Sequence, residues 1–268
     1  MPKIDLHTHS DFSDGTCTPE EVVHAALKAG ASVYALTDHD TTDGVLRAKK
    51  VCEEHRILFT PGVEISTREH DHLHFTGYNI DLENAEFQAF LAQNRRERIR
   101  KIIQQLIAAG VDITEEEVFS RAPNTVSRAH VADALKAKGI VPSRQEGFRR
   151  YLVPGQPGYV PSAGVTAIEA IQHIKRAGGM PVIAHPGIVS EHWNFPAWTE
   201  AGLEGVEVFY PAHTFTMKQD LLAITRKYGL LATAGSDYHG PRAGRITTPG
   251  MQIPQSHYDK LLRRLFNR

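Results

Sequence analysis

The sequence predicts an α/β fold: a barrel of alternating parallel strands and helices that carries a helical insertion. Two observations predict the barrel. Short apolar runs typical of buried strands alternate with amphipathic helical stretches, and about seven such strand–helix units fit along the chain. A third observation sets the middle of the chain apart, because no convincing strand pattern interrupts residues 86–160. We therefore expect residues 1–85 and 161–268 to form the barrel and residues 86–160 to form the insertion.

The first third of the chain contains the first barrel units. Residues 4–6 end an apolar run that should form the first strand. A helix should begin after Thr18, with Pro19 at its first position and Glu21 completing a capping box. Gly30 should end that helix. The next expected elements are a strand at 33–37, a helix at 44–55, and strands at 57–59, 63–65 and 73–78.

The insertion and the last third of the chain differ in pattern. In the insertion we expect helices at 86–109, 114–119 and 127–138. After residue 161 the alternation of strands and helices resumes. The expected elements there are helices at 167–177, 196–201, 217–228 and 254–266, and strands at 182–184, 206–209 and 230–234.

Composition narrows the class of protein. A chain of 268 residues that is 41% hydrophobic, with a formal net charge of -1, is typical of a globular protein. There is no run of 18 apolar residues and no secretory signal pattern, so we expect a cytoplasmic protein without a membrane span. Cys17 and Cys52 form no CxxC pair and are expected to be free thiols.

Charge is distributed unevenly along the chain. Residues 86–152 contain 12 Lys and Arg against 8 Asp and Glu, so the insertion is basic and the remainder is acidic. An acidic, histidine-rich body suits metal ions, and a basic insertion beside it suits an anionic substrate.

Two histidines next to the first apolar run indicate a metal clamp. His7 and His9 are separated by one residue, and residues i and i+2 of an extended chain point the same way. Other apolar runs also carry a histidine or a carboxylate, and in a parallel barrel such positions gather at one rim. These further candidate ligands are His39, Glu64, His74, His185, Asp237 and His239.

The type and number of these residues indicate a polynuclear site. Histidine and carboxylate ligands without thiolate suit Mn, Fe or Zn, and the candidates are too many for one ion. We expect two or three divalent ions that share a bridging carboxylate. Periodicity cannot choose among His70, His72 and His74, which alternate along the chain. Loop aspartates could bind metal, orient a ligating imidazole or cap a turn; they are Asp11, Asp14, Asp38, Asp40 and Asp43.

Taken together, these motifs resemble the PHP family, named for polymerase-associated and histidinol-phosphatase domains and related to the amidohydrolases. The motifs are His7-Thr8-His9-Ser10 with Ser13-Asp14-Gly15, Leu36-Thr37-Asp38-His39-Asp40, Pro61-Gly62-Val63-Glu64, His74, Ala184-His185-Pro186 and Gly235-Ser236-Asp237-Tyr238-His239. The resemblance covers the chain outside the insertion. It implies a distorted (β/α)7 TIM-like barrel that holds up to three metal ions.

The resemblance also implies a ligand set for each ion. His7, His9, Glu64 and Asp237 would hold the first ion. Glu64 would bridge to a second ion, held also by His74 and His185. The third ion would be held by Asp14, His39 and His239. Mn is the expected metal, with Fe or Zn as alternatives.

The insertion resembles the branch of the family that acts on 3′,5′-nucleoside bisphosphates or trims short RNA from its 5′ end. The motifs are Asn94-Arg95-Arg96-Glu97-Arg98 and Thr125-Val126-Ser127-Arg128-Ala129-His130-Val131-Ala132. This resemblance implies a phosphatase that removes the 3′ phosphate from a small nucleotide, with short RNA as a further substrate and no protein partner. A helix that begins near residue 127 would favour a phosphate at its N-terminus. The expected substrate contacts are Arg95, Arg98, Ser127, Arg128, His130 and Asp40.

Several alternatives stay open. The proton donor to the leaving oxygen could be Asp40, His213 or His239. The chain could be another phosphatase of the same family, such as one acting on histidinol phosphate, although the basic insertion favours a second anionic group. It could be an amidohydrolase acting on C–N bonds, but no strand end offers a lysine to bridge the metals. Two further alternatives are a module that acts on DNA ends and a non-catalytic domain that binds a partner in a metal-dependent way.

Overall fold

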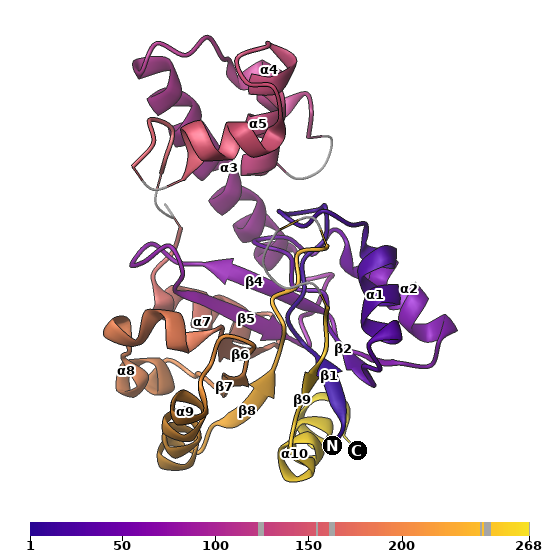
Figure 1. Ribbon diagram of the computed structural model, residues 1–268. Helices are drawn as coiled ribbons and strands as arrows, with labels where there is room; N and C mark the ends of the chain where they lie inside the picture. The colour runs from indigo at the N-terminus through magenta and orange to yellow at the C-terminus, as the bar shows by residue number, and fades with distance from the viewer. Residues whose placement is uncertain (123–125, 154, 161–163, 242, 244–247, 268) are drawn as a thin grey trace.

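The computed structural model describes residues 1–122, 126–153, 155–160, 164–241, 243 and 248–267. It is a mixed α/β structure in which helices surround two sheets (Figure 1). The first sheet has the order β3-β2-β1-β9 and the second the order β4-β5-β6-β7-β8. The strands of the first sheet are β1 (Lys3–Asp5), β2 (Val33–Tyr34), β3 (Leu58–Phe59) and β9 (Met251–Gln252). Those of the second are β4 (Gly62–Ser66), β5 (His74–Tyr78), β6 (Met180–Ile183), β7 (Gly205–Phe209) and β8 (Leu231–Ala234).

The expected closed parallel barrel is not confirmed. Between the two described sheets, single bridges join Thr8 to Tyr238 and His39 to Glu64. The sheets are also mixed, because β5 runs antiparallel to both β4 and β6, and β9 runs antiparallel to β1. Residues 67–73, which connect β4 to β5, are too few for the helical crossover that a parallel pair needs. The short connection therefore imposes the antiparallel pairing that the sequence pattern did not predict.

Most expected helices are confirmed to within about two residues. α1 begins at Pro19 after the N-cap Thr18, and the capping box with Glu21 is present. The sequence pattern missed α6, the 3₁₀ and π-helical segments and strand β9. The α-helices are α1 (Pro19–Lys28), α2 (Val45–Glu54), α3 (Ala85–Ala108), α4 (Glu115–Phe119), α5 (Arg128–Ala137), α6 (Arg144–Gly147), α7 (Ala167–Arg176), α8 (Phe195–Glu200), α9 (Phe215–Tyr228) and α10 (Gln255–Phe266). A π-helical turn covers Phe148–Leu152, and a 3₁₀ segment covers Pro186–His192.

The helices bury the apolar faces of the two sheets. In Figure 1, α7, α8 and α9 lie beside the five-stranded sheet, α1 and α2 lie on the other side of the molecule, and α10 lies below β8 and β9. Phe75 on β5 packs edge-on against Trp198 of α8 in the largest apolar cluster. No helix within the described ranges is long and apolar enough to cross a bilayer.

The helical segment in the middle of the chain has an apolar cluster of its own. Ile102, Ile103 and Leu106 of α3 pack with Leu135 of α5 in this cluster. α3 runs from the body of the molecule up to α4 and α5, which stand above the sheets in Figure 1. The expected boundary at residue 161 lies outside the described residues, so the division into two domains stays a prediction.

Candidate metal centre

The candidate ligands lie on or just after six strands of the two sheets and meet at one place. His7 and His9 follow β1, and His39 follows β2. His185 lies two residues after the end of β6, and Asp237 and His239 follow β8. The sequence pattern predicted the ligands at the rim where parallel strands end. This expectation is wrong for two residues, because Glu64 lies inside β4 and His74 lies at the start of β5. His74 still reaches the cluster because β5 is antiparallel, so its first residue lies at the edge where its neighbour β6 ends.

Glu64 lies at the centre of the cluster, and both of its carboxylate oxygens contact imidazoles. Its Oε2 is 3.2 Å from His7 Nε2, His9 Nε2 and His39 Nδ1. Its Oε1 is 3.0 Å from His74 Nδ1 and 3.1 Å from His185 Nε2. A carboxylate that presents separate oxygens to two sets of histidines has the geometry of a bridging ligand.

Asp14 and Asp237 bring further carboxylates to the cluster. Asp237 Oδ1 is 3.2 Å from His9 Nε2 and 3.5 Å from His7 Nε2. Asp14 Oδ1 is 3.2 Å from His239 Nε2, and Asp14 Oδ2 is 3.9 Å from His39 Nε2. Three groups among the described residues have candidate ligand atoms within 4.8 Å of one another. They are His7–His9–Glu64–Asp237, His9–Asp14–His39–His239 and His39–Glu64–His74.

The polar atoms of this cluster fit divalent cations. Several of them are fully buried yet find no hydrogen-bond partner in the described part of the chain: His7 Nε2, both ring nitrogens of His9, His39 Nδ1, Glu64 Oε2, His185 Nδ1 and His239 Nε2. Some nitrogens lie within 3.2 Å of an oxygen, but their directions do not form hydrogen bonds. Burial of so many polar atoms without hydrogen-bond partners raises the free energy of the folded chain. Cations shared among these atoms would bind their lone pairs and remove this cost. The mixed imidazole and carboxylate set suits Mn, Fe or Zn.

Residues next to the cluster hold its loops in place. Asp38 is buried and accepts hydrogen bonds from Ser10 N at 2.7 Å, Ser10 Oγ at 2.6 Å and Ser13 Oγ at 2.6 Å. Burial raises the pKa of Asp38 above its usual value. Asp38 thus anchors the loop that carries Asp14, a role that the sequence did not predict for the loop aspartates.

The backbone at the cluster adopts unusual conformations. Asp40, His185 and Asp237 have φ values of 51°, 31° and 57°, in the left-handed region that non-glycine residues rarely adopt. Such strain persists where the surrounding contacts determine the conformation, and it concentrates at functional sites.

Glu207 is a buried carboxylate beside the cluster that the sequence pattern did not identify. It lies in β7 between Val206 and Val208 and is 1% exposed. His7 Nδ1 lies 3.1 Å and 3.2 Å from its two oxygens, and His185 N donates to its Oε2 at 2.7 Å. A glutamate inside an apolar strand was the available signal, although its partner His7 lies 200 residues away in the sequence.

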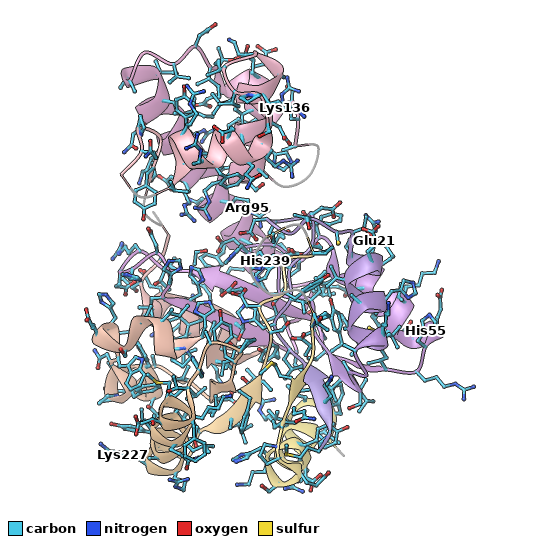
Figure 2. The ribbon with its side chains drawn as sticks, viewed as in Figure 1. Glu21, His55, Arg95, Lys136, Lys227 and His239 are labelled. Atoms are coloured by element: carbon cyan, nitrogen blue, oxygen red, sulfur yellow. The ribbon has the colours of Figure 1, made fainter. Side chains whose placement is uncertain are left out.

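A cavity of about 290 Å³ opens onto the cluster and joins it to the helical segment. Asp14, His39 and His74 line one side of it. Three arginines line the other side, which are Arg95 and Arg98 of α3 and Arg128 of α5. Figure 2 shows Arg95 above His239, where α3 leaves the body of the molecule, whereas Lys136, His55 and Lys227 lie at the periphery.

The first two arginines are mostly buried and stay charged. Burial lowers the pKa of Arg95 and of Arg98 to about 10, which leaves both protonated at neutral pH. Arg95 Nη2 donates to His39 O at 2.5 Å, so part of its guanidinium supports the backbone of a candidate ligand. Arg98 Nε finds no hydrogen-bond partner within the described residues and therefore has a free donor.

The third arginine begins α5. The guanidinium carbon of Arg128 lies 5.9 Å from the centre of the Phe148 ring, and Arg128 follows the N-cap Ser127. Ser127 also lines the cavity. His130 is not among the residues that line the cavity in the described structure; its Nδ1 accepts from Ser127 N at 3.0 Å. His130 therefore caps the helix, while Thr125 and the side chain of Asn94 lie outside the described residues.

The three candidate proton donors are placed very differently. Asp40 lines the cavity, and burial raises its pKa. His239 Nε2 belongs to one of the three ligand groups, 3.2 Å from Asp14. His213 Nδ1 lies 3.0 Å from Val208 O and its Nε2 accepts from Gly187 N at 3.0 Å, so both ring nitrogens are engaged.

Residues 5–130 match the model of the PHP domain. The 3′,5′-nucleoside bisphosphate phosphatase of Chromobacterium violaceum is 36% identical, and the match covers 91% of this chain and 90% of that protein. The 5′-3′ exoribonuclease Rnm of Escherichia coli is 34% identical over 88% of this chain and 85% of that protein.

Solved structures agree with the sequence matches. A candidate metal-dependent phosphoesterase from Bifidobacterium adolescentis superposes with a TM-score of 0.80 at 29% identity, covering 98% of both chains. An amidohydrolase from Chromobacterium violaceum, solved with bound sulfate and no metal, has a TM-score of 0.77 at 32% identity and covers 97% of this chain and 96% of its own. The histidine and carboxylate cluster thus stands in a chain that belongs to the PHP-domain family.

Proposed function

We propose that this protein is a metal-dependent phosphomonoesterase that removes the 3′ phosphate from 3′,5′-nucleoside bisphosphates. Trimming of short RNA from its 5′ end is a second activity of the same site. The proposal is supported by two similar proteins, one named as a nucleoside bisphosphate phosphatase and one as a 5′-3′ exoribonuclease.

A single observation carries this proposal, namely the cavity that places three arginines opposite the candidate metal ligands. One phosphate at the ligands would react, and a second phosphate would contact Arg98 and Arg128. Guanidinium groups bind phosphate through paired N–H donors, and the N-terminus of α5 adds backbone N–H groups and a favourable helix dipole. A remote contact of this kind would orient the reacting phosphate.

The residues of the cluster would divide the metal ligation among themselves. His7, His9, Glu64 and Asp237 would hold one ion, and Glu64 would bridge to a second beside His74 and His185. A third ion would lie among Asp14, His39 and His239. When bound, such ions acidify a water molecule for attack on phosphorus and offset the charge of the phosphoryl oxygens. We infer that Mn fills these positions, which metal analysis of the purified protein would check.

Asp40 is the proposed proton donor to the leaving 3′ oxygen. It lines the cavity, and its raised pKa lets it hold a proton closer to neutral pH than an exposed aspartate would. His213 is the weaker candidate, since Val208 and Gly187 engage both of its ring nitrogens. His239 is needed at a metal position.

The sheets and the helical residues 86–160 would have different roles in the proposed function. We propose that the two sheets approximate a distorted barrel; the support is that single bridges between them join Thr8 to Tyr238 and His39 to Glu64. Residues 86–160 would act as a cap that supplies the arginines of the cavity. The apolar side of the cavity, with Ile99 and Tyr159, would contact the ribose and base.

The experiment compares two substrates in an Arg128→Ala variant. Loss of one charge-assisted contact costs about 1.5–3 kcal/mol, so kcat/KM for adenosine 3′,5′-bisphosphate should fall roughly 10- to 150-fold. Hydrolysis of p-nitrophenyl phosphate, which has no second phosphate, should stay nearly unchanged. Arg149→Ala is the matched control, because Arg149 belongs to the same segment but pairs with Glu146 at the surface. Equal losses on both substrates, or wild-type protein that releases no phosphate from the bisphosphate, would refute the proposal.

A further inference from the structure

Glu207 contacts candidate ligands on two sides of the cluster. We propose that Glu207 is a positioning residue that couples two metal positions, because it fixes the tautomer of His7 and the backbone of His185 at the same time. This inference rests on the proposed metal binding of the cluster and adds a carboxylate that belongs to none of the three ligand groups.

The contact with His7 determines which ring nitrogen is available. His7 Nδ1 is 3.1 Å from Oε1 and 3.2 Å from Oε2 of Glu207. An ionised carboxylate only accepts hydrogen bonds, so Nδ1 must carry the proton. Nε2 of His7 is then the nitrogen left to bind a metal ion, and it faces Glu64 Oε2 at 3.2 Å and Asp237 Oδ1 at 3.5 Å. A carboxylate that orients a ligating imidazole in this way also raises its basicity toward a metal.

The contact with His185 fixes a strained backbone. His185 N donates to Glu207 Oε2 at 2.7 Å, and the residue has φ 31° and ψ 49°. A non-glycine residue in this region is strained, so it needs contacts that hold it there. With its backbone held, His185 directs Nε2 to 3.1 Å from Glu64 Oε1.

The two contacts reach opposite oxygens of the bridging carboxylate. His7 lies at Oε2 of Glu64, whereas His185 lies at Oε1. Movement of Glu207 would therefore disturb the ligands on both sides of Glu64 together. This shared dependence is what couples the two positions.

The end of β8 is shaped for this arrangement. A Cβ atom at Gly235 would lie 2.3 Å from Glu207 Oε1 and 2.3 Å from His7 Cβ, far inside van der Waals contact. The space that any other residue would occupy at position 235 is therefore taken by the Glu207–His7 pair. This is an observation independent of the hydrogen bonds, and it indicates that the pair is closely fitted.

The test measures Mn²⁺ binding by titration calorimetry of metal-stripped protein. In Glu207→Gln the side chain loses its negative charge and one of its two acceptor oxygens, so the remaining carbonyl oxygen is a weaker acceptor for His7 Nδ1 and His185 N. Loss of a carboxylate that orients a metal ligand typically weakens metal affinity about 10- to 100-fold. We expect that loss at two positions together, accompanied by a smaller rise in melting temperature on Mn²⁺ addition. Glu204→Gln is the matched control, since Glu204 lies just before β7 but pairs with Lys175 and Arg264.

Wild-type affinity and stoichiometry in Glu207→Gln, or a loss confined to one position, would overturn the proposal. A second measurement uses the wild-type chain, in case the variant does not fold. Imidazole ¹⁵N shifts of His7 in Zn²⁺-loaded protein should show a protonated Nδ1 and a metal-bound Nε2, and the reverse assignment would contradict the inference. Neither readout involves phosphate release. A chain that binds Mn²⁺ as expected but does not hydrolyse nucleotides would therefore refute the proposed function and leave this inference intact.

Discussion

Asp5 offers a stringent test of how the fold supports the centre. It is the last residue of β1, is fully buried, and accepts hydrogen bonds from Ser236 N at 2.9 Å, Ser236 Oγ at 2.6 Å and Gly250 N at 2.6 Å. One carboxylate thus ties β1 to the loop after β8 and to the segment before β9. Burial raises the pKa of Asp5 from 3.8 to about 6, against the opposing effect of these donors.

The sign and size of the effect on stability follow from this pKa. Because the folded chain binds the proton of Asp5 more tightly than the unfolded chain does, raising the pH through this range favours unfolding. A rise from 3.8 to about 6 corresponds to about 3 kcal/mol. The contribution of Asp5 is therefore fully present below about pH 4 and is lost by about pH 7. The variant Asp5→Asn has no such titration.

The assay is urea unfolding of metal-stripped wild type and Asp5→Asn at several pH values between 4 and 7. We expect the stability of the wild type relative to the variant to fall by about 3 kcal/mol over this range. Asp259→Asn is the matched control, because Asp259 is only half-buried on α10, where it accepts a hydrogen bond from Gln255 Nε2. A difference between wild type and Asp5→Asn that does not change with pH would refute the reasoning. It would mean that the hydrogen bonds to Ser236 and Gly250 fully offset the effect of burial on the pKa of Asp5.

Four further predictions test separate parts of the structure. Gly235→Ala should weaken Mn²⁺ binding more than tenfold, since its Cβ would overlap Glu207 Oε1; unchanged calorimetric affinity would contradict the fit at this position. Burial raises the pKa of Cys52 to about 12, so Ellman's reagent at pH 8 should label this thiol only after unfolding, and rapid labelling of native protein would disprove its burial. Tyr159→Ala should raise KM for a nucleoside bisphosphate by roughly 5- to 100-fold with kcat retained if the ring stacks on the base, whereas a fall in kcat alone would argue against stacking. Leu106→Ala should destabilise the helical segment by about 2–5 kcal/mol in urea unfolding while leaving Mn²⁺ binding intact, and loss of the metal would show that the segment and the sheets do not behave as separate units.

Local signals in the sequence were sufficient for most helices and for the gathering of the ligands. The capping box at Thr18 depends on residues three apart, so it can be read without knowing the fold. His7 and His9 share a direction because extended chain repeats every second residue. The same local rule says nothing about pairing direction, so the antiparallel course of β5 was missed. That direction depends on the length of the connection after β4, and the pattern of apolar residues does not report it.

Long-range contacts were the other part that the sequence could not provide. Glu207 and His7 are brought together only when β7 and β1 take their places in the two sheets. His130 shows a related difficulty, because a histidine three residues after a serine can contact substrate or cap a helix. The hydrogen bond from Ser127 N to its Nδ1 shows that it caps α5. A residue type and a spacing thus identify candidates, whereas the orientation of the side chain decides between roles.

The left-handed backbone at Asp40, His185 and Asp237 has a consequence for anyone who would engineer this chain. Glycine or asparagine tolerates such dihedral angles more readily than aspartate or histidine does. Random libraries screened solely for heat resistance should therefore enrich replacements at these three positions. The selected variants would be more heat-resistant but would lack activity, so a screen for thermal stability should be combined with a screen for activity.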